Sequence, residues 1–378
     1  SVSRSFARFL NPTLSFQKGD LERIPVILPD SYPECDAIFE KITQICERNE
    51  SRCEIYPLFS FSECYSPLSK CNGYLSKLFF DFNQDIKNDL DHLACIEKSI
   101  DEIFSKSYGF STDDSDCHGS CSLINIKDEN AFAKDFSSVA LGCMMGRYSI
   151  DKPGIIYANA GNEGFDPSQY TTFSADDDGI VPVSDIDWFA DDATPRLVEF
   201  IKTVFGAETL DENLAWIAES FDPKKGETPV ETIRRYFSTQ FFKNHMQMYK
   251  KRPIYWLFSS GKQKAFECLV YLHRYNESTL SRMRAQYVTP LQGKLNARIE
   301  HLRRETESAG STAAKNKLRK EVEMLVKKQT ELAKFDEELR HYADQRIKLD
   351  LDDGVRVNYG KFGNLLAETK AISGGNDE

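Results

Sequence analysis

Two thiols and an imidazole lie within five residues at Cys117, His118 and Cys121, and this combination of side chains can bind zinc. Cys64 and Cys71 would complete a tetrahedral set of ligands. Structural zinc sites, however, favour gaps of roughly two to four residues in both ligand pairs, and the second pair is spaced more widely. The ten cysteines also follow no even framework spacing, which favours reduced thiols over disulfides. We therefore predict no metal site.

The carboxylates and histidines suggest no catalytic centre. The run Asp176–Asp178 has the ligand type of a hard-cation site but lacks the calcium-loop pattern, so we expect a solvated acidic loop. His273 lies in the apolar stretch VYLHRY, and we interpret it as a partly buried, hydrogen-bonded residue and not as a base. The sequence contains no Gly-rich phosphate loop, His-Glu-x-x-His or Gly-x-Ser-x-Gly motif. We assign no catalytic and no cofactor-binding residue.

Basic side chains near predicted helix ends and turns form the candidate site. They alternate with tyrosines, and donors placed in this way suit contacts with phosphate groups. The predicted DNA-binding residues are Arg234, Arg235, Lys250, Lys251, Arg252, Lys262, Lys264 and Arg274. The alternative is that these cations pair with the acidic half of the chain in an internal interface.

The charge of the chain is segregated along the sequence. The 378 residues include 48 Lys and Arg and 59 Asp and Glu, for a net charge of -11. Residues 234–348 nevertheless hold 25 basic and 12 acidic side chains. This asymmetry indicates either a surface for a polyanion or basic and acidic faces that meet within the molecule. A set of solvated helices rich in Lys and Arg is a third interpretation.

The composition is that of a folded protein, with 40% hydrophobic and 28% charged residues. The length corresponds to roughly two or three domains. No apolar run approaches the roughly 18 residues of a membrane span, and the N-terminus lacks the regions of a signal peptide. We expect a cytoplasmic protein without membrane contact. Because the chain opens at Ser1 without a Met, we interpret it as a segment of a longer protein.

Several helices are predicted from spacing and capping signals. Apolar residues recur every three or four positions in 74–104 and 130–148, which indicates amphipathic helices. A Thr-Pro pair at Thr194 and a capping box that begins at Thr228 predict two further helix starts. Residues 263–275 are also predicted to be helical.

The last third of the chain has coiled-coil spacing over 285–347, and a break at 308–311 predicts an antiparallel helical hairpin. Short β elements are predicted near 11–28, 253–258 and 349–359, the last as a β-hairpin around an Asp-Gly turn. The predicted fold class is mainly α with small β elements, with helical domains followed by a C-terminal antiparallel helical (coiled-coil) hairpin.

Four sequence blocks resemble a known family: NPTLSFQKGDLERIPVI at 11–27, GCMMGRYSIDKPGIIYAN at 142–159, YKKRPIYWLFSSGKQKAFECLVYLHRYN at 249–276 and LDDGVRVNYGKFG at 351–363. With these blocks the chain resembles the PglX family of adenine-specific DNA methyltransferases from BREX phage-defence systems. It resembles more distantly the fused restriction and methylation enzymes with a C-terminal specificity region. The resemblance spans nearly the whole chain.

The resemblance implies that the parent enzyme holds S-adenosylmethionine on a doubly wound sheet and grips a flipped adenine with an Asn-Pro-Pro-Tyr type motif. Neither the Gly-containing loop nor that motif is present here. The segment Asn11-Pro12-Thr13-Leu14 has Thr and Leu where Pro and an aromatic residue are required, and we interpret it as a turn. We therefore expect a C-terminal, non-catalytic portion that binds double-stranded DNA and holds no cofactor itself.

Six segments are expected under this interpretation. They are the end of a target-recognition β region (1–30), a helical domain (31–150), a Gly/Pro/Asp-rich connection (151–190), a basic α/β region (191–284), the helical hairpin (285–347), and a β-hairpin with a disordered tail (348–378). One alternative hypothesis is a scaffold that docks other BREX defence proteins through the helical hairpin. Another is a segment with nuclease or methyltransferase activity of its own.

Overall fold

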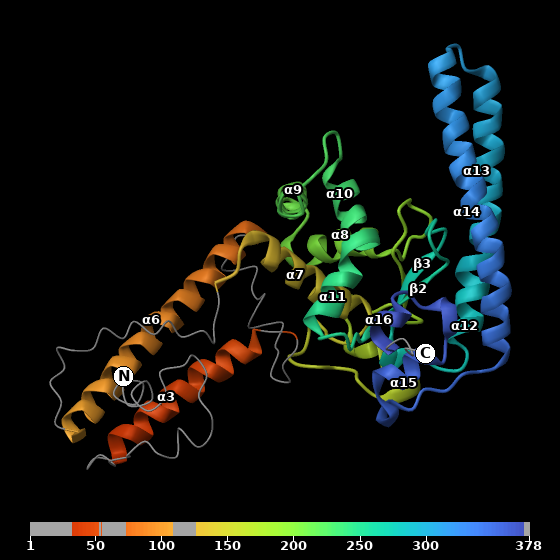
Figure 1. The fold of residues 1–378 in the computed structure, drawn as a ribbon. Helices are drawn as coiled ribbons and strands as arrows, with labels where there is room; N and C mark the ends of the chain where they lie inside the picture. The colour runs from red at the N-terminus through yellow and green to blue at the C-terminus, as the bar shows by residue number, and fades with distance from the viewer. Residues whose placement is uncertain (1–31, 53, 55–72, 109–125, 374–378) are drawn as a thin grey trace, which may run out of the picture. The chain divides into compact units, whose positions relative to one another are not determined.

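The structure is a computed structural model that describes residues 32–52, 54, 73–108 and 126–373 (Figure 1). It divides into two compact units. Unit 1 comprises residues 1–53 and 79–127, and unit 2 comprises residues 54–78 and 128–378. The predicted connection at 151–190 lies inside unit 2. The following predicted features lie outside the described residues: the β element at 11–28, the turn at 11–14, the tail after 373, and Cys64, Cys71, Cys117, His118 and Cys121.

Unit 1 contains α3 (Tyr32–Ser51) and most of α6 (Leu75–Tyr108). The helix predicted over 74–104 is confirmed, and its apolar stripe is buried at Phe82, Ile86 and Leu93. Next to this stripe, Arg52 Nη1 donates to Asp89 Oδ2 over 3.0 Å. The Asp89 side chain is 5% exposed, so this ion pair satisfies a carboxylate that would otherwise be buried without a partner.

Five α-helices form much of unit 2: α7 (Glu129–Met144), α8 (Ala193–Phe205), α9 (Leu210–Ser220), α10 (Pro229–Tyr236) and α11 (Phe242–Met248). The helix predicted over 130–148 and the helix starts near Thr194 and Thr228 are confirmed. The capping box is formed as predicted, because the Thr228 side chain accepts from the Glu231 N–H while the Glu231 carboxylate accepts from the Thr228 N–H. Short 3-10 and π segments complete this part of the chain: η2 (Ala160–Asn162), η3 (Pro167–Gln169), η4 (Phe237–Phe241) and η5 (Leu272–Arg274).

A small antiparallel sheet lies within unit 2, with strand order β1-β3-β2. Its strands are β1 (Ile180–Pro182), β2 (Tyr255–Ser259) and β3 (Glu267–Tyr271). The predicted strand near 253–258 is confirmed as β2. The helix predicted over 263–275 is wrong, because Cys268 to Tyr271 pair with β2 and form the fully buried central strand. A strand buried on both faces has no alternating pattern that would separate it from a buried helix.

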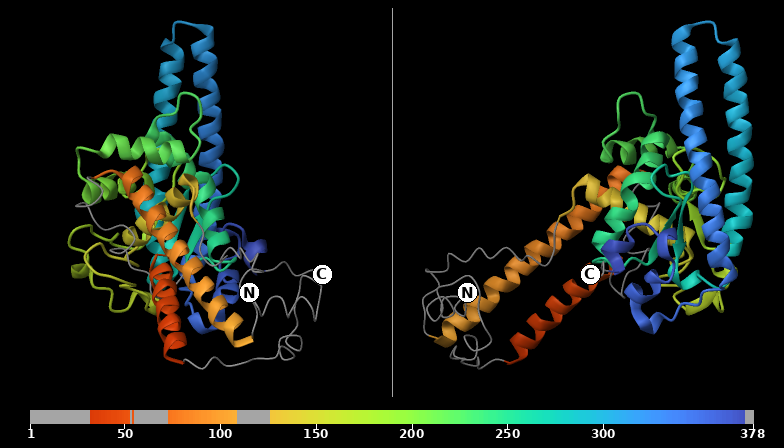
Figure 2. Two further views of the ribbon diagram at one scale, coloured as in Figure 1. Left: turned by 90° about the vertical axis from the view of Figure 1, so that its left-hand side faces the viewer. Right: turned by 45° about the vertical axis from the view of Figure 1, so that its right-hand side comes forward.

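The predicted helical hairpin is confirmed. It consists of α13 (Thr289–Ser308) and α14 (Thr312–Asp344), preceded by α12 (Thr279–Arg282) and the π-helix η6 (Met283–Val288). The two long helices run side by side and project beyond the rest of unit 2 (Figures 1 and 2). Their buried seam consists of Leu291, Leu295, Ile299, Leu302, Leu325, Leu332, Phe335 and Leu339. The predicted fold class, mainly α with small β elements, is therefore confirmed.

The β-hairpin predicted over 349–359 is wrong, because this stretch is helical. It holds η7 (Leu351–Asp353) and α15 (Gly354–Gly360), and η8 (Gly363–Leu365) and α16 (Thr369–Ser373) follow. Tertiary packing decides the outcome, since Tyr359 and Phe362 are fully buried with their ring centroids 5.2 and 5.8 Å from that of Trp256. Tyr359 lies in α15 and Phe362 in the turn directly after it, so this short helical segment brings both rings against Trp256. No described helix is both long and apolar enough to cross a bilayer.

The base of the helical hairpin braces the turn between β2 and β3. Glu331 on α14 accepts from Ser260 Oγ at 2.8 Å and from the backbone N–H groups of Gln263 and Ala265 at 2.7 and 3.2 Å. This carboxylate thereby satisfies two backbone N–H groups of the turn in addition to the hydrogen bonds that the turn makes within itself. The contact also fixes the turn against α14.

Replacing Glu331 by Ala should therefore destabilise the turn. We expect the free energy of unfolding to fall by about 1–2 kcal/mol, because two backbone N–H groups lose a charged acceptor. Amide hydrogen exchange at Gln263 and Ala265 should also accelerate. Glu337→Ala, at an exposed position of the same helix, is the matched control for chemical denaturation. Equal losses in the two variants would contradict the bracing role.

Candidate functional site

Four of the eight predicted DNA-binding residues are exposed. Lys250, Lys251 and Arg252 follow α11, and Lys262 lies in the turn between β2 and β3. Among the described residues, none of these four cations takes part in an ion pair with a carboxylate. Their charged groups are therefore available to a partner in solution.

Lys250 and Lys251 both have left-handed backbone conformations, with φ of 49° and 62°. The Lys251 N–H donates to the Met246 carbonyl over 2.7 Å, which closes the end of α11. Helices commonly end in such a turn, and glycine is the residue that normally occupies it. A residue with a Cβ costs roughly 1–2 kcal/mol in this conformation. The sequence therefore presents two lysines where folding alone would favour glycine.

The exposed cations do not form one continuous patch. Arg252 lies just before β2 and Lys262 just after it, so the five-residue strand separates them by roughly 17 Å. Phosphate contacts need not be adjacent, because each duplex strand offers a phosphate at intervals of a few ångströms. The arrangement is that of two separate basic turns at opposite ends of β2.

Arg234 has a structural role. Its Nη1 donates to Asp192 Oδ1 over 3.1 Å, and the Asp192 side chain is 1% exposed. The same carboxylate accepts from the N–H groups of Thr194 at the start of α8 and of Ser184 after β1, at 3.0 and 2.8 Å. Burial raises the pKa of Asp192, and the charge of Arg234 opposes that rise. The ion pair thus joins α10 to the start of α8 and is not free for phosphate.

Arg235 and Lys264 are also engaged within the protein. Arg235 Nε donates to Glu227 Oε1 over 2.9 Å, and this hydrogen bond lowers the pKa of Glu227 to about 2. Lys264 Nζ lies 3.0 Å from the nearly buried carboxylate of Glu267. Both cations neutralise carboxylates of the basic region itself.

Arg274, another predicted DNA-binding residue, is 1% exposed and engaged within the protein. Its guanidinium group donates to the carbonyls of Asp176 and Asp177 at 2.5 and 2.8 Å and to Asn162 Oδ1 at 3.0 Å. The guanidinium carbon lies 3.8 Å from the centroid of the Phe165 ring, within cation–π distance. Arg274 therefore clamps two loops onto the end of the sheet.

The aromatic residues around the basic clusters form a core beneath them. Tyr236, Tyr255 and Tyr275 are each no more than 2% exposed. His245 accepts from two backbone N–H groups at 3.1 Å, and burial lowers its pKa to about 3. His273 is half-buried, as expected, and burial lowers its pKa to about 4. These side chains support the basic turns and do not present a surface for stacking on bases.

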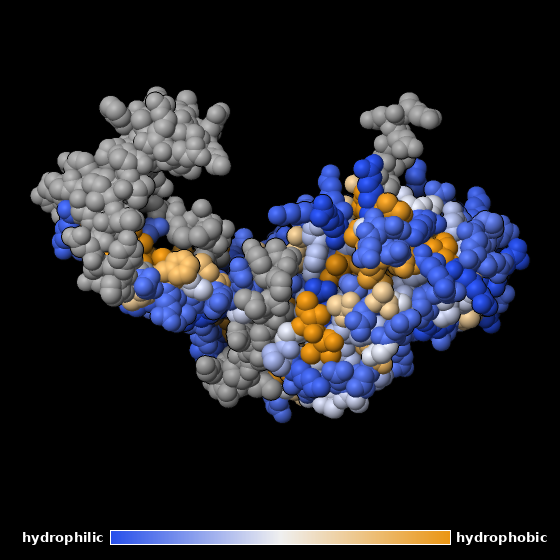
Figure 3. All heavy atoms as spheres, turned by 90° about the horizontal axis from the view of Figure 1, so that it is seen from below, coloured by the Kyte–Doolittle hydropathy of each residue, from blue (hydrophilic) through white to orange (hydrophobic). Residues whose placement is uncertain are grey.

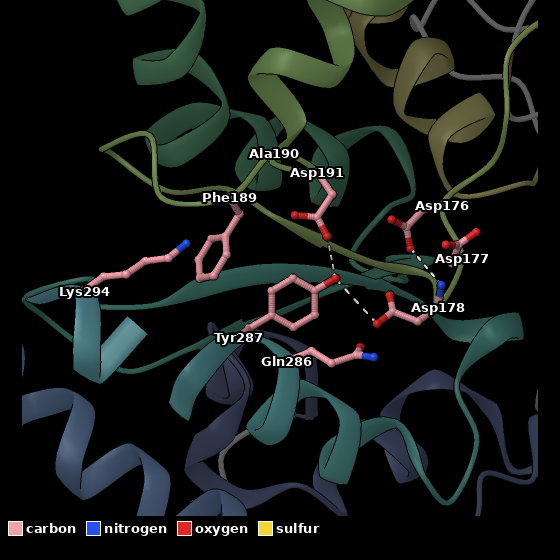
Figure 4. Close-up of a pocket in the computed structure, with 9 residues that line it drawn as sticks. All are labelled: Asp176, Asp177, Asp178, Phe189, Ala190, Asp191, Gln286, Tyr287 and Lys294. Atoms are coloured by element: carbon pink, nitrogen blue, oxygen red, sulfur yellow. Dashed lines mark hydrogen bonds between the residues drawn. The ribbon is translucent and has the colours of Figure 1, made fainter. Parts of the chain in front are cut away.

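Unit 2 contains an acidic pocket of about 370 Å³ that the sequence analysis did not anticipate (Figure 4). The loop before β1, the segment before α8, η6 and α13 supply its lining, which is Asp176, Asp177, Asp178, Phe189, Ala190, Asp191, Gln286, Tyr287 and Lys294. Tyr287 Oη donates to Asp191 Oδ2 over 2.7 Å and lies 3.5 Å from Asp178 Oδ2. Asp176 Oδ1 accepts from the Gly179 N–H over 2.7 Å, which turns the acidic run inward.

The predicted solvated loop is wrong for Asp178, which is 8% exposed. Burial raises its pKa to about 7, and the charge of Asp176 adds to the rise. Burial also raises the pKa of Asp191. The signal in the sequence is the apolar run Ile-Val-Pro-Val that follows Gly179 and draws the preceding residues into the core. In the part of the chain that the structure describes, no group of three or more His, Cys, Asp or Glu side chains is arranged to hold a metal.

Comparison with known proteins identifies adenine-specific methyltransferases as relatives. No family model matches the chain. The adenine-specific methyltransferase BrxX of Escherichia coli O9:H4 (strain HS) is 43% identical over 404 residues, which cover 97% of this chain and 32% of the relative. The adenine-specific methyltransferase PglX of Lacticaseibacillus casei (strain Zhang) is 34% identical over 380 residues, which cover 98% of this chain and 31% of the relative.

The chain is thus homologous to a portion of the BrxX and PglX adenine-specific methyltransferases. It spans about a third of the length of these curated relatives. The predicted resemblance to the PglX family is confirmed.

The raised pKa of Asp178 predicts a pH-dependent stability. The carboxyl is protonated more readily in the folded state than in the unfolded state. Its contribution to the free energy of unfolding is therefore complete below about pH 4 and is lost as the pH rises to about 7. Asp178→Asn should retain the neutral form at every pH. We expect the stability of the variant relative to the parent chain to rise between pH 4 and 7, by at most about 1.4 kcal/mol per pH unit.

Urea denaturation at a series of pH values tests this expectation. Asp177→Asn removes the same charge from an exposed position in the loop and corrects for the change in net charge. A stability difference between Asp178→Asn and the parent chain that stays constant across this pH range would contradict the account.

Proposed function

We propose that this chain is the DNA-recognition and positioning region of a BREX adenine-specific methyltransferase. It binds double-stranded DNA, while the methyl transfer takes place in another part of the parent protein. The homology supports DNA as the substrate of the whole enzyme, since both relatives are adenine-specific methyltransferases. We also propose other BREX defence proteins as partners of the whole enzyme.

The phosphate contacts are proposed for the exposed cations Lys250, Lys251, Arg252 and Lys262. Two exposed lysines in backbone conformations that glycine adopts at lower cost are the observation that carries the proposal. Backbone strain of this kind concentrates at functional sites. Since phosphate contacts position a protein without reading sequence, these residues would set the register of the enzyme on DNA.

The chemistry of S-adenosylmethionine is assigned to another region of the parent enzyme. Nucleotide-type cofactors bind at the carboxyl ends of parallel strands in doubly wound sheets. Within the described residues, the sheet has three antiparallel strands and does not fit such a site. We therefore derive no methyl-transfer step through these residues.

A protein-docking role is the second candidate function. Figure 3 shows several hydrophobic patches among hydrophilic surface on the side of unit 2 seen from below. Exposed large apolar residues of unit 2 include Ile155, Val230 and Val357. Single apolar side chains are normal on a surface, and only a contiguous patch of several hundred Å² indicates an interface. We therefore retain DNA binding as the proposed function.

Replacing both Lys250 and Lys251 by Gly separates binding from folding. The change relieves two strained conformations, so the free energy of unfolding should stay the same or rise. Two phosphate contacts are lost, so the slope of log K against log salt should become less negative by about 2. Fluorescence anisotropy with a labelled duplex at several salt concentrations measures this slope.

Lys224→Gly combined with Lys225→Gly is the matched control, because these two exposed lysines also lie side by side in a loop. The control pair should leave the salt slope unchanged. An equal change of the salt slope in both variants would show a general charge effect. Absence of any salt-dependent duplex binding by the parent chain would contradict the proposed function itself.

A further inference from the structure

The end of the helical hairpin contributes no side chain to the core of unit 2. We call residues 303–320 the arm tip. None of its side chains is buried, and α14 runs for 13 residues, roughly 20 Å, before its first buried side chain at Leu325. In Figures 1 and 2 this end of the hairpin projects away from the other elements of unit 2. Core packing therefore does not explain why the helices extend so far.

The charge of the hairpin is polarised along its length. The arm tip holds two acidic residues, Glu305 and Glu307, and six basic residues, which are Arg303, Arg304, Lys315, Lys317, Arg319 and Lys320. The remainder of α14, residues 321–344, holds seven acidic and four basic side chains. Among the described residues, no ion pair involves any of the six cations of the arm tip.

Some of these cations are placed unfavourably in the free arm. Lys315 and Lys317 lie in the first two turns of α14, where the helix dipole disfavours positive charge and no acidic residue offsets it. Lys315 and Arg319 are four residues apart, so their like charges repel on one flank of the helix. An anionic ligand would relieve this local repulsion and stabilise an arm that packs no side chain into a core.

The distribution of the cations indicates the kind of ligand. Successive helix positions are rotated by about 100°, so Lys317 and Lys320 lie on one side of α14 while Arg319 lies on another. A single small anion or one acidic helix would meet only one of these sides. The phosphates of a duplex line both edges of a groove and can contact cations on several sides of an inserted element.

We propose that the arm tip is a second phosphate-binding site that engages the backbone of duplex DNA. The inference rests on the proposed function and adds a contact remote from the basic turns beside β2. The arm tip contacts phosphates and reads no base sequence, and it becomes ordered further when DNA binds.

The experiment compares two triple variants of the full chain. Lys317→Gln, Arg319→Gln and Lys320→Gln neutralise the arm tip. Lys327→Gln, Lys334→Gln and Arg340→Gln remove two lysines and one arginine from exposed positions nearer the base of the same helix. Glutamine has a helix propensity close to those of lysine and arginine, so both variants should remain folded.

For the arm-tip triple variant, we expect the salt slope of duplex binding to become less negative by about 2–3. The control triple variant should leave it within about 0.5 of the parent value. Hydrogen exchange provides a second measurement: amides of residues 312–324 should gain protection when duplex is added to the parent chain but not to the arm-tip variant.

Equal slope changes in the two triple variants would overturn the inference, because they would show a general charge effect. An unchanged slope in the arm-tip variant would also overturn it, and would leave protein docking as the role of the arm. In either case the proposed function is tested separately. If the proposed function were wrong, the parent chain would not bind the duplex at all, whereas failure of this inference leaves duplex binding through Lys250 and Lys251 intact.

Discussion

A buried charge needs partners, and in this protein that requirement is clearest at Arg274. Its guanidinium group bonds to two backbone carbonyls and one amide oxygen and lies over the Phe165 ring. These contacts hold the acidic run beside β1, shape the pocket around Tyr287 and connect both to the end of β3. Removing one partner from such a buried arrangement is strongly destabilising, so the clamp constrains everything around it.

The same requirement divides the basic residues into two sets. Arg234, Arg235, Lys264 and Arg274 meet carboxylates or carbonyls inside unit 2 and contribute to the fold. The remaining four predicted residues stay in solvent, and so do the cations of the arm tip. Some cations thus meet acidic residues or backbone carbonyls within unit 2, and others face outward. The outward set carries the proposed function.

Local patterns were sufficient to predict most helices. α6 and the seam of α13 and α14 each bury one stripe, and a stripe leaves a three- and four-residue period in the sequence. The capping box at Thr228 is likewise a local signal. Residues 349–359 show the limit of this reasoning, since their alternation predicts strands but the packing of Tyr359 against Trp256 selects a helix.

The candidate site depends on contacts that no local pattern records. Arg274 bonds to Asp176 from a position 98 residues away, so neither its burial nor the inward turn of the acidic run was visible in the sequence. Tyr287 and Asp191 meet across a similar separation of 96 residues. The left-handed conformations of Lys250 and Lys251 follow from the way α11 ends, and Lys at such a position is not a signal for it. Residue type marked the basic segments, and three-dimensional contacts decided which of their cations remain exposed.

The most direct test of this division is a lysine acetylation footprint of the full chain, read by mass spectrometry with and without a DNA duplex. The account predicts that Lys250, Lys251 and Lys262 react readily in the free chain and are protected by the duplex, while Lys224 and Lys225 react equally in both samples. A footprint in which the duplex protects all exposed lysines alike, or none of them, would contradict it.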